Sequence, residues 1–407
     1  MNRISIGEKI YSLEWLRDQA SAGQNVLRRA HQGRIKPLCL CGNKQVAKEL
    51  YVAKRNFYYL ARMPGTGKLH APWCDFYGDA DGGPGSKSQP AIIEKEDGRL
   101  DVNLWSPLTR PAKTTAPSSE TKSRQIERPG VSRASITLLG LLYKLWQDGN
   151  LHVWYPVRKY ARTINTIHKS LNEIAAYMDI GDDGLQDRFI VTKYQDSWPA
   201  SEAKTREAID AITKGKDSAA ILIGELEDWR PSQKEQGGAG LKIRYLKDCV
   251  WMGKELAERI ETSFQREKAC IDDKNQKIMV ICTVFQNGVT LNADDAALMR
   301  TSKEYIPVES SYELEVTRRL IEQERKFKKP VRMDENDQRP DFILLDTDPN
   351  WFMEVFGIDN DEAYTARKHE KLAAYQQQGI PCWSWEATSS KTIPAFPAPS
   401  PETLDEE

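Results

Sequence analysis

Three cysteines and one histidine near the N-terminus have the residue types and the spacing of a metal site. They form two pairs, Cys39 with Cys41 and His70 with Cys74, in the patterns C-x-C and H-x3-C. Zn2+ prefers four tetrahedral nitrogen or sulfur ligands, and a site whose four positions are filled by protein is structural rather than catalytic. The sequence therefore predicts a structural Zn2+ site. The alternative is a set of ordinary reduced thiols and a surface histidine.

Two carboxylates in the last third of the chain lie at the ends of apolar runs that are typical of buried strands. Asp341 precedes the run 342–345, and Glu354 follows the run 351–353. Carboxylates at adjacent strand ends can hold a hard cation such as Mg2+ or Mn2+. Such a cation lowers the pKa of a bound water and stabilises charge that develops on a scissile phosphate. The pair therefore predicts phosphodiester hydrolysis.

The segment around these carboxylates, 310–388, is predicted to form a helix, three strands, a second helix and a fourth strand. This is an α/β layer arrangement. With its two acids it resembles the core of the PD-(D/E)XK, or restriction-endonuclease-like, nucleases. The resemblance implies that a carboxylate on the first helix completes the site, and we expect Glu313 ahead of Glu315. The alternative for Glu313 is a charged side chain that faces solvent.

The sequence departs from the nuclease pattern at Phe356, where the motif has a lysine two residues after the glutamate. In the family that lysine orients the attacking water or stabilises the transition state. A lysine from the following helix is a known variation in this superfamily. Four residues recur on one face of that predicted helix: Tyr364, Arg367, Lys368 and Lys371.

We expect Lys368 to replace the motif lysine, with Lys371 as the second candidate. Arg367 and Tyr364 are predicted to contact nucleic acid. For each of these residues the alternative is a solvated basic helix face.

Length and shifts of composition predict a multi-domain α/β protein. Five segments are expected: an N-terminal helix with a zinc-ribbon-like segment at 1–78, a linker with little regular structure at 79–130, a mixed α/β middle domain at 131–300, the restriction-endonuclease-like core at 301–388 and a disordered tail at 389–407. Within the linker, only 99–108 has the pattern of a strand.

Local patterns position the candidates within these segments. The stretch 12–33 predicts one amphipathic helix. Residues 49–67 predict a hairpin of two short strands that would bring the two zinc-ligand pairs together. In the middle domain, 134–149 and 160–178 predict two helices that are a candidate helix-turn-helix.

The segment "MPGTGK" is similar to a phosphate-binding loop but lacks two of its requirements. Arg62 stands at the position of the first glycine, and Leu69 stands where a hydroxyl should bind Mg2+. We therefore expect a tight turn from Gly65 to Lys68 and no nucleoside triphosphate as a ligand.

The charge balance of the whole chain gives no bulk attraction to nucleic acid or to an anionic membrane. Lys and Arg number 58 against 59 Asp and Glu in 407 residues. Any DNA-binding surface must therefore be a local patch. The chain begins without the apolar core of a secretory signal, and no stretch approaches the roughly 18 apolar residues of a membrane span. We expect a cytoplasmic protein with no membrane partner.

Five sequence motifs together resemble the bacterial family called domain of unknown function 1173. They are "CLCG", "YYLARMPGTG", "HAPWC", "RPDFILLD" and "MEVFG", and the resemblance covers most of the chain. Members look like cargo of integrating and conjugative elements. This implies a role near DNA mobility, defence or plasmid upkeep, with DNA and conjugation or mobile-element proteins as partners.

Three functions remain open. The first is a DNA endonuclease that depends on Mg2+ or Mn2+. The second is a DNA-binding or conjugation accessory protein whose nuclease-like core has lost cleavage, and Phe356 favours this alternative. The third, weaker one is a nucleotidyl-transfer or primase-like unit in the middle domain, based on Glu225, Glu227 and Asp228 after an apolar strand.

Overall fold

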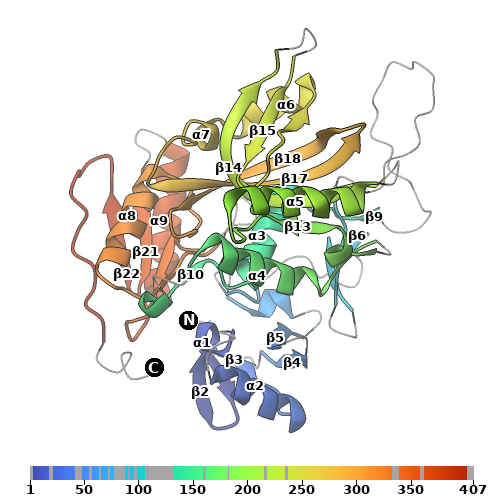
Figure 1. Cartoon of the computed structure of the whole chain (residues 1–407). Helices are drawn as coiled ribbons and strands as arrows, with labels where there is room; N and C mark the ends of the chain where they lie inside the picture. The colour runs from blue at the N-terminus through green and yellow to red at the C-terminus, as the bar shows by residue number, and fades with distance from the viewer. Residues whose placement is uncertain are drawn as a thin grey trace.

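The chain folds into a mixed α/β structure of several sheets (Figure 1). The computed structural model describes residues 3–17, 22–41, 48–54, 57–63, 66–71, 74–77, 88–89, 91–95, 99–105, 108, 132–158, 162–181, 183–214, 218–233, 237–331, 339–357 and 362–400. No helix in these ranges is both long enough and apolar enough to cross a membrane.

The N-terminal module, which we define as the described residues of 3–77, combines a three-stranded sheet with two helices and a hairpin. The sheet has the order β2-β1-β3, and the hairpin pairs β4 with β5. The elements are β1 (Arg3–Ile6), β2 (Lys9–Ser12), α1 (Leu13–Arg17), α2 (Gly23–Gln32), β3 (Leu38–Cys39), β4 (Leu50–Lys54) and β5 (Tyr58–Arg62). The predicted hairpin is therefore present.

The prediction of one helix over 12–33 is wrong, because its described residues form two separate helices, α1 and α2. The Gln24 side chain explains the break. Its amide nitrogen donates to the carbonyl oxygen of Leu16 at 2.9 Å, and its amide oxygen accepts from the Tyr58 N–H at 2.9 Å. A side chain near the start of α2 thus satisfies a carbonyl near the end of α1, which a continuous helix would have bonded internally.

The largest sheet has six strands in the order β13-β14-β15-β16-β18-β17, and β14 also pairs with β17. Its strands are β13 (Phe189–Val191), β14 (Ala220–Pro231), β15 (Ala239–Ile243), β16 (Val250–Met252), β17 (Gln276–Asn287) and β18 (Thr290–Ser302). The extra pairing closes a circuit through β14 to β18, so the long apolar runs of β14 and β17 are buried on both faces. Helices α5 (Trp198–Thr213), α6 (Lys254–Ser263) and α7 (Gln265–Lys268) lie against it.

The helix-turn-helix candidate does not form. Helices α3 (Leu138–Asp148) and α4 (Ile164–Ala175) are separated by β10 (Val153–Trp154) and a 3-10 turn instead of a short turn. The apolar faces of both helices are buried in one core with β13, β14 and β17. Helix α3 has no exposed residue, and the exposed residues of α4 are Asn165, Thr166 and Lys169.

Part of the predicted linker belongs to this middle region. The described residues of 79–130 include β6 (Ser88–Gln89), β7 (Ile92–Glu94) and β8 (Leu100–Val102). Strand β8, inside the predicted 99–108 strand, pairs in parallel with β11 (Met178–Ile180). A second strand of this sheet, β7, was not predicted, because its apolar run is only two residues long.

The C-terminal sheet has the order β10-β19-β20-β21-β22. The predicted order of elements from 310 to 388 is present as α8 (Ser311–Glu322), β19 (Phe327–Lys328), β20 (Phe342–Leu344), β21 (Phe352–Phe356), α9 (Glu362–Gln377) and β22 (Cys382–Glu386). Strands β19, β20 and β21 are antiparallel neighbours, and β22 returns parallel to β21 after α9. The edge strand β10 comes from the segment assigned to the middle domain.

Residues 389–400 of the predicted disordered tail pack on this sheet. The indole N–H of Trp383 donates to the Ala395 carbonyl oxygen at 3.0 Å, and that of Trp385 donates to Ser390 O at 2.9 Å. Ile393 is buried in the same core. The prediction of disorder rested on the proline-rich composition of this segment. Composition does not reveal that two tryptophans donate their indole N–H groups to backbone carbonyls of the segment. Residues 401–407 lie outside the described residues.

Candidate metal centre and carboxylate site

The four predicted zinc ligands lie together in the N-terminal module. The ligand atoms of Cys39, Cys41, His70 and Cys74 are all within 4.8 Å of one another, and all four residues are buried. The Cys39 and Cys74 sulfurs are 3.6 Å apart, and His70 Nδ1 lies 3.4 Å from the Cys41 sulfur. Tetrahedral bonds of about 2.3 Å to sulfur place two such ligands about 3.8 Å apart. The donor set therefore has the composition and the size of a Zn2+ site.

The local fold brings the two ligand pairs together. Cys39 ends β3 and lies opposite Ile4 of β1. The β4–β5 hairpin separates the pairs in sequence and returns the chain to His70, as predicted. Residues 67–69 form a 3-10 turn that ends at His70, so the described part of "MPGTGK" positions a predicted metal ligand. Gly65 of the predicted tight turn lies outside the described residues.

Hydrogen bonds within the cluster favour a thiolate at Cys41. The Cys39 thiol contributes most to the lowered pKa of Cys41, followed by Cys74 and His70, and the Ala71 N–H lies 3.3 Å from the Cys41 sulfur. Burial raises the pKa of Cys74 instead. Because Zn2+ binds the deprotonated form of cysteine, a thiolate already stabilised in a buried site fits a cation there.

The histidine ring has a defined orientation. Nδ1 of His70 faces the sulfurs, at 3.4 Å from Cys41 and 3.7 Å from Cys74. Nε2 is buried and has no hydrogen-bond partner among the described residues. The ring packs at a tilt against Phe76, with 5.6 Å between centroids. The nitrogen presented to a metal is therefore Nδ1.

The residue after Cys74 links the metal site to the C-terminal sheet. Asp75 lies 2.6 Å from Lys328 Nζ on β19 and 2.5 Å from an Arg17 nitrogen, and Lys328 also lies 3.3 Å from Glu14. Burial alone would raise the pKa of Asp75, but Lys328 and Arg17 outweigh it and hold that pKa well below its usual range. Lys328 is 1% exposed, so this ion cluster is a buried joint.

Apolar packing crosses the same joint. Ile343 of β20, Phe352 of β21 and Tyr375 of α9 share one buried core with Ile4 and Leu13 of the N-terminal module. The metal-binding segment and the C-terminal sheet therefore stabilise each other.

The predicted carboxylates lie at matching positions on β20 and β21. Phe342 pairs with Met353, so Asp341 and Glu354 face each other one step further along the two strands. Asp341 Oδ2 accepts a hydrogen bond from the Val355 N–H at 2.7 Å. The two residues are 4% and 2% exposed. Asp341 directly precedes β20 as the sequence pattern predicted, but Glu354 is the middle residue of β21 and does not lie at a strand end.

Lys371 reaches this pair from α9. Its Nζ lies 2.9 Å from Glu354 Oε1, and it also donates to the Arg339 carbonyl oxygen at 2.8 Å. The Tyr375 hydroxyl, one helical turn later, donates to Glu354 Oε1 at 2.8 Å. Burial first, and then Glu354, raises the pKa of Tyr375 above its usual range, which keeps it a hydrogen-bond donor.

Lys368, the first-ranked substitute for the motif lysine, lies elsewhere. It pairs with Glu386 on β22, and its ammonium lies 4.5 Å from the centroid of the Phe356 ring. Tyr364 packs edge-on against the same ring, at 6.5 Å. Arg367 is exposed on α9. The structure thus reverses the predicted order of the two lysines, because the ring at position 356 and Glu386 hold Lys368 over the neighbouring strand.

Glu313 does not join the carboxylate pair. It accepts the Glu309 N–H at 2.8 Å and lies 3.3 Å from Lys329 Nζ, which is 1% exposed. Within the described ranges, no third Asp, Glu, His or Cys clusters with Asp341 and Glu354. The observed contacts of Glu313 are those of a helix-capping residue in a buried ion pair.

The acids behind the primase-like hypothesis are engaged in internal contacts. Glu225 is buried, accepts the Tyr305 hydroxyl at 2.5 Å and lies 3.3 Å from Lys277. Asp228 pairs with Arg230 at the surface. Burial raises the pKa of Glu227. These residues form no metal-binding group within the described part of the chain.

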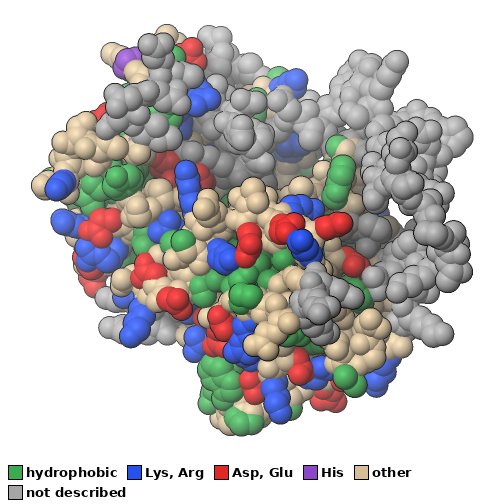
Figure 2. All heavy atoms as spheres, turned by 90° about the horizontal axis from the view of Figure 1, so that it is seen from above, with side chains coloured by type: hydrophobic (Ala, Val, Ile, Leu, Met, Phe, Trp, Pro, Cys, Tyr) green, Lys and Arg blue, Asp and Glu red, His purple; other side chains and the backbone are tan. Residues whose placement is uncertain are grey.

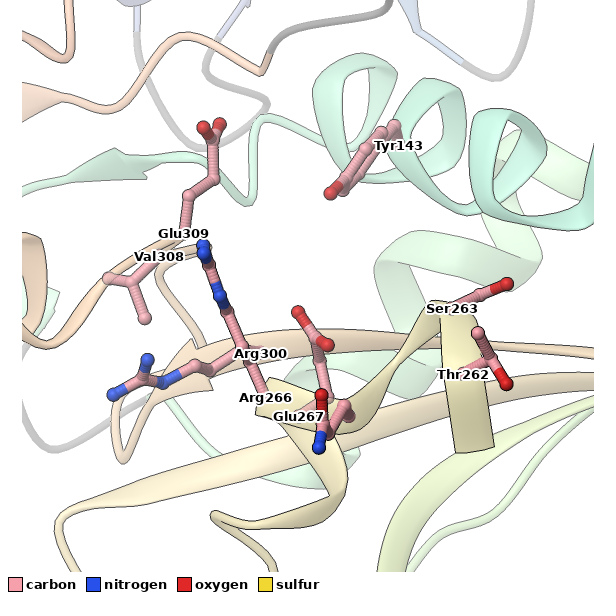
Figure 3. Close-up of a pocket in the computed structure, with 9 residues that line it drawn as sticks. Tyr143, Thr262, Ser263, Arg266, Glu267, Arg300, Val308 and Glu309 are labelled. Atoms are coloured by element: carbon pink, nitrogen blue, oxygen red, sulfur yellow. The ribbon is translucent and has the colours of Figure 1, made fainter. Parts of the chain in front are cut away.

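A polar cavity of about 320 Å3 lies between α3, the α6–α7 corner and the end of β18 (Figure 3). Its wall includes Tyr143, Arg266 and Arg300. Arg300 donates to Gln276, and burial followed by Glu309 raises the pKa of Tyr143. No residue predicted as a site residue lines this cavity.

Two important residues were not predicted. Tyr375 follows Lys371 by four positions, so helical spacing could have placed both on Glu354. Lys328 lies on β19 but pairs with acids more than 250 positions away in sequence. No local signal could have revealed that contact.

The comparisons with known proteins identify one family. A family model described as "Protein of unknown function (DUF1173)" matches residues 12–388. No curated protein and no solved structure matches the chain. The match spans the metal cluster, the central sheet and the carboxylate pair, so the chain as a whole belongs to this family of unknown function.

Proposed function

We propose that this protein is a metal-dependent nuclease that hydrolyses phosphodiester bonds of DNA. The observation that carries the proposal is the Lys371 ammonium, 2.9 Å from Glu354 on the strand next to Asp341. A nuclease core that lacks the motif lysine at Phe356 needs a cation from elsewhere, and Lys371 supplies one at the same carboxylate. The order of α8, three antiparallel strands, α9 and a parallel fourth strand supports the same proposal.

Each residue has a distinct role in this proposal. Asp341 and Glu354 hold a Mg2+ or Mn2+ ion, which when bound polarises water and the scissile phosphate. Lys371 orients the attacking water or stabilises the charge that develops on the phosphate. Tyr375 positions Glu354 by a hydrogen bond, because its hydroxyl donates to the oxygen that Lys371 also contacts. Arg367, exposed on the same helix, contacts the backbone of the nucleic acid.

The metal cluster of the N-terminal module has a structural role. Its four protein ligands leave no position for a substrate. Zn2+ is the ion that fits three cysteines and one histidine.

The test is cleavage of plasmid DNA by the purified full-length chain with Mg2+ or Mn2+. Asp341→Ala should abolish cutting while DNA binding persists. The matched control is Glu386→Gln on the neighbouring strand, where the side chain is 44% exposed, and it should keep cutting. Equal cutting by wild type and Asp341→Ala would assign the activity to a contaminant and overturn the proposal.

A second function is favoured by a specific observation. Lys371 neutralises the charge of Glu354, and the Tyr375 hydroxyl donates a hydrogen bond to it. Asp341 accepts the Val355 N–H, so the two acids also have the contacts of an internal polar cluster. A DNA-binding or conjugation accessory protein without cleavage would have this arrangement. If the protein binds DNA but does not cut it with any divalent ion, the accessory function is favoured over the nuclease. The association with mobile genetic elements remains a proposal under both functions.

A further inference from the structure

The charges of the chain are distributed unevenly between its two parts. Residues 1–78 contain 13 of the 58 Lys and Arg but only 5 of the 59 Asp and Glu. This gives the N-terminal segment a formal charge of +8, while the remaining residues carry −9. The near-zero charge of the whole chain therefore conceals a basic segment of the kind that nucleic acid attracts.

The basic segment includes a helix with one fully exposed polar face. Helix α2 buries Gly23, Leu27 and Ala30 against the module. Its opposite side exposes only amide and guanidinium side chains: Asn25, Arg28, Arg29 and Gln32. The helix contains no acidic residue. The exposed Arg34 and Lys36 follow it directly, and Lys36 forms a solvent-exposed ion pair with Glu49.

Some arginines elsewhere in the structure are held by carboxylates, whereas Arg266 and Arg367 are exposed and form no ion pair within the described residues. Arg318 on α8 pairs with Glu315 and Glu322, and Arg206 on α5 pairs with two aspartates. Across the described ranges, by contrast, Arg28 and Arg29 have no carboxylate partner. On the face seen in Figure 2, which looks down on the end of the molecule away from α2, basic and acidic side chains are interspersed.

The helix is held rigidly by the metal-binding module. His31 contacts the Val52 carbonyl oxygen at 2.8 Å, on the hairpin between the two ligand pairs. Gly33 ends the helix by bonding to the Arg29 carbonyl oxygen at 2.8 Å. A favourable interaction with the helix dipole accounts for Arg29 in the last turn, but it does not account for Asn25, Arg28 and Gln32.

The chemistry of this face matches duplex DNA. Arginine binds guanine through two hydrogen bonds, asparagine and glutamine bind adenine in the same way, and an α-helix fits the major groove. Arginine and lysine also neutralise phosphates. We propose that the exposed face of α2 enters the major groove of duplex DNA, with Asn25, Arg28, Arg29 and Gln32 toward the bases, and Arg34 and Lys36 on the phosphates. This inference does not require cleavage, so it is separable from the proposed nuclease activity.

The test is equilibrium binding of a labelled duplex DNA to the zinc-loaded full-length chain, with Ca2+ in place of Mg2+ so that binding is read without cutting. Arg28→Glu with Arg29→Glu should lower affinity at least about tenfold. Arg34→Ala with Lys36→Ala, which removes the two side chains placed on the phosphates, should lower the slope of log affinity against log salt by about 1.8.

The matched control reverses the charge of two lysines on other helices. Lys169 and Lys254 are 76% and 65% exposed, so Lys169→Glu with Lys254→Glu gives the same change of charge away from α2. It should change affinity less than about twofold. The proposal fails if the two charge-reversal variants lose affinity equally, or if the alanine variant leaves the salt slope unchanged. It also fails if the wild type binds duplex RNA more tightly than duplex DNA, or does not bind DNA. If the wild type binds DNA through α2 but does not cut it, the proposed nuclease activity is contradicted and the DNA-binding proposal is not.

Discussion

Lys371 and Glu354, on a helix and on a strand of the C-terminal sheet, form an ion pair of 2.9 Å beside Asp341. Lys368, three positions earlier, pairs with Glu386. If Lys371 supplies the catalytic cation, Lys371→Ala should reduce the cleavage rate about a hundredfold or more, as expected for loss of a group that stabilises transition-state charge. Lys368→Ala should reduce it less than about threefold. The opposite ranking, measured by plasmid nicking, would restore Lys368 as the catalytic candidate.

Tyr375 contributes a hydrogen bond to a buried carboxylate. Tyr375→Phe keeps the ring that packs edge-on against Phe352, with 5.1 Å between centroids, and removes only the donor to Glu354. We expect a loss of about 1.5–3 kcal/mol in the free energy of unfolding, since hydrogen bonds to charged groups contribute this much. Urea denaturation measures it. An unchanged midpoint would mean that water replaces the hydroxyl.

The metal cluster should be needed for stability. Metal analysis of the purified protein should find one Zn2+ per chain, and Cys41→Ser should abolish binding and lower the melting temperature. The control is Cys270→Ser, since Cys270 is a half-buried cysteine outside the cluster, and it should change neither quantity. A full metal content in Cys41→Ser would show that this sulfur is not a ligand.

The buried joint at Lys328 should be far more sensitive than a surface pair. Lys328→Met leaves Glu14 buried without this cation and Asp75 with Arg17 alone, which should cost about 3–5 kcal/mol of unfolding free energy. Lys36→Met breaks a pair of similar length, 2.7 Å, whose side chains are 59% and 43% exposed. That change should cost less than about 1 kcal/mol. Similar losses in the two variants would contradict a buried joint.

His152 gives stability a dependence on pH. Burial, followed by the charge of Lys328, lowers the pKa of His152 well below its usual value. The unfolded chain therefore takes up a proton near its ordinary pKa of about 6.5, whereas the folded chain does not. Stability is complete above that pH and falls as the pH decreases through it.

Replacing this histidine should remove the dependence. The melting temperature of His152→Leu should fall less than that of the wild type between about pH 7.5 and 5.5. Zinc content must be equal at both ends of the range, because the cluster cysteines also take up protons. Parallel curves for the two proteins would exclude His152 as the cause.

Sequence patterns predicted much of the local arrangement. The spacing of Cys39, Cys41, His70 and Cys74 found a complete donor set, because two pairs around a hairpin can only meet in a few ways. The apolar runs beside Asp341 and Glu354 predicted two neighbouring strands, although Glu354 lies in the middle of β21 and not at its end. Periodicity also showed that a basic residue would face them from α9, although it could not choose between Lys368 and Lys371, whose partners are set by tertiary contacts.

The predictions failed where distant segments decide the outcome. The Gln24 amide divides the helix predicted over 12–33 by bonding to Leu16 and Tyr58, and no periodicity encodes such a contact. Strand β10 pairs with β19 across more than 170 positions. The predicted segment boundaries lie at changes of amino-acid composition. Such changes do not reveal that a strand of one segment completes the sheet of another.

The core shared by β1, α1, β20, β21 and α9 has a consequence for how the protein is made. The N-terminal module is translated long before the strands and the helix that cover its apolar face. The module therefore cannot complete its core until the chain has been translated past α9. Removal of either β1 or α9 should give an insoluble product.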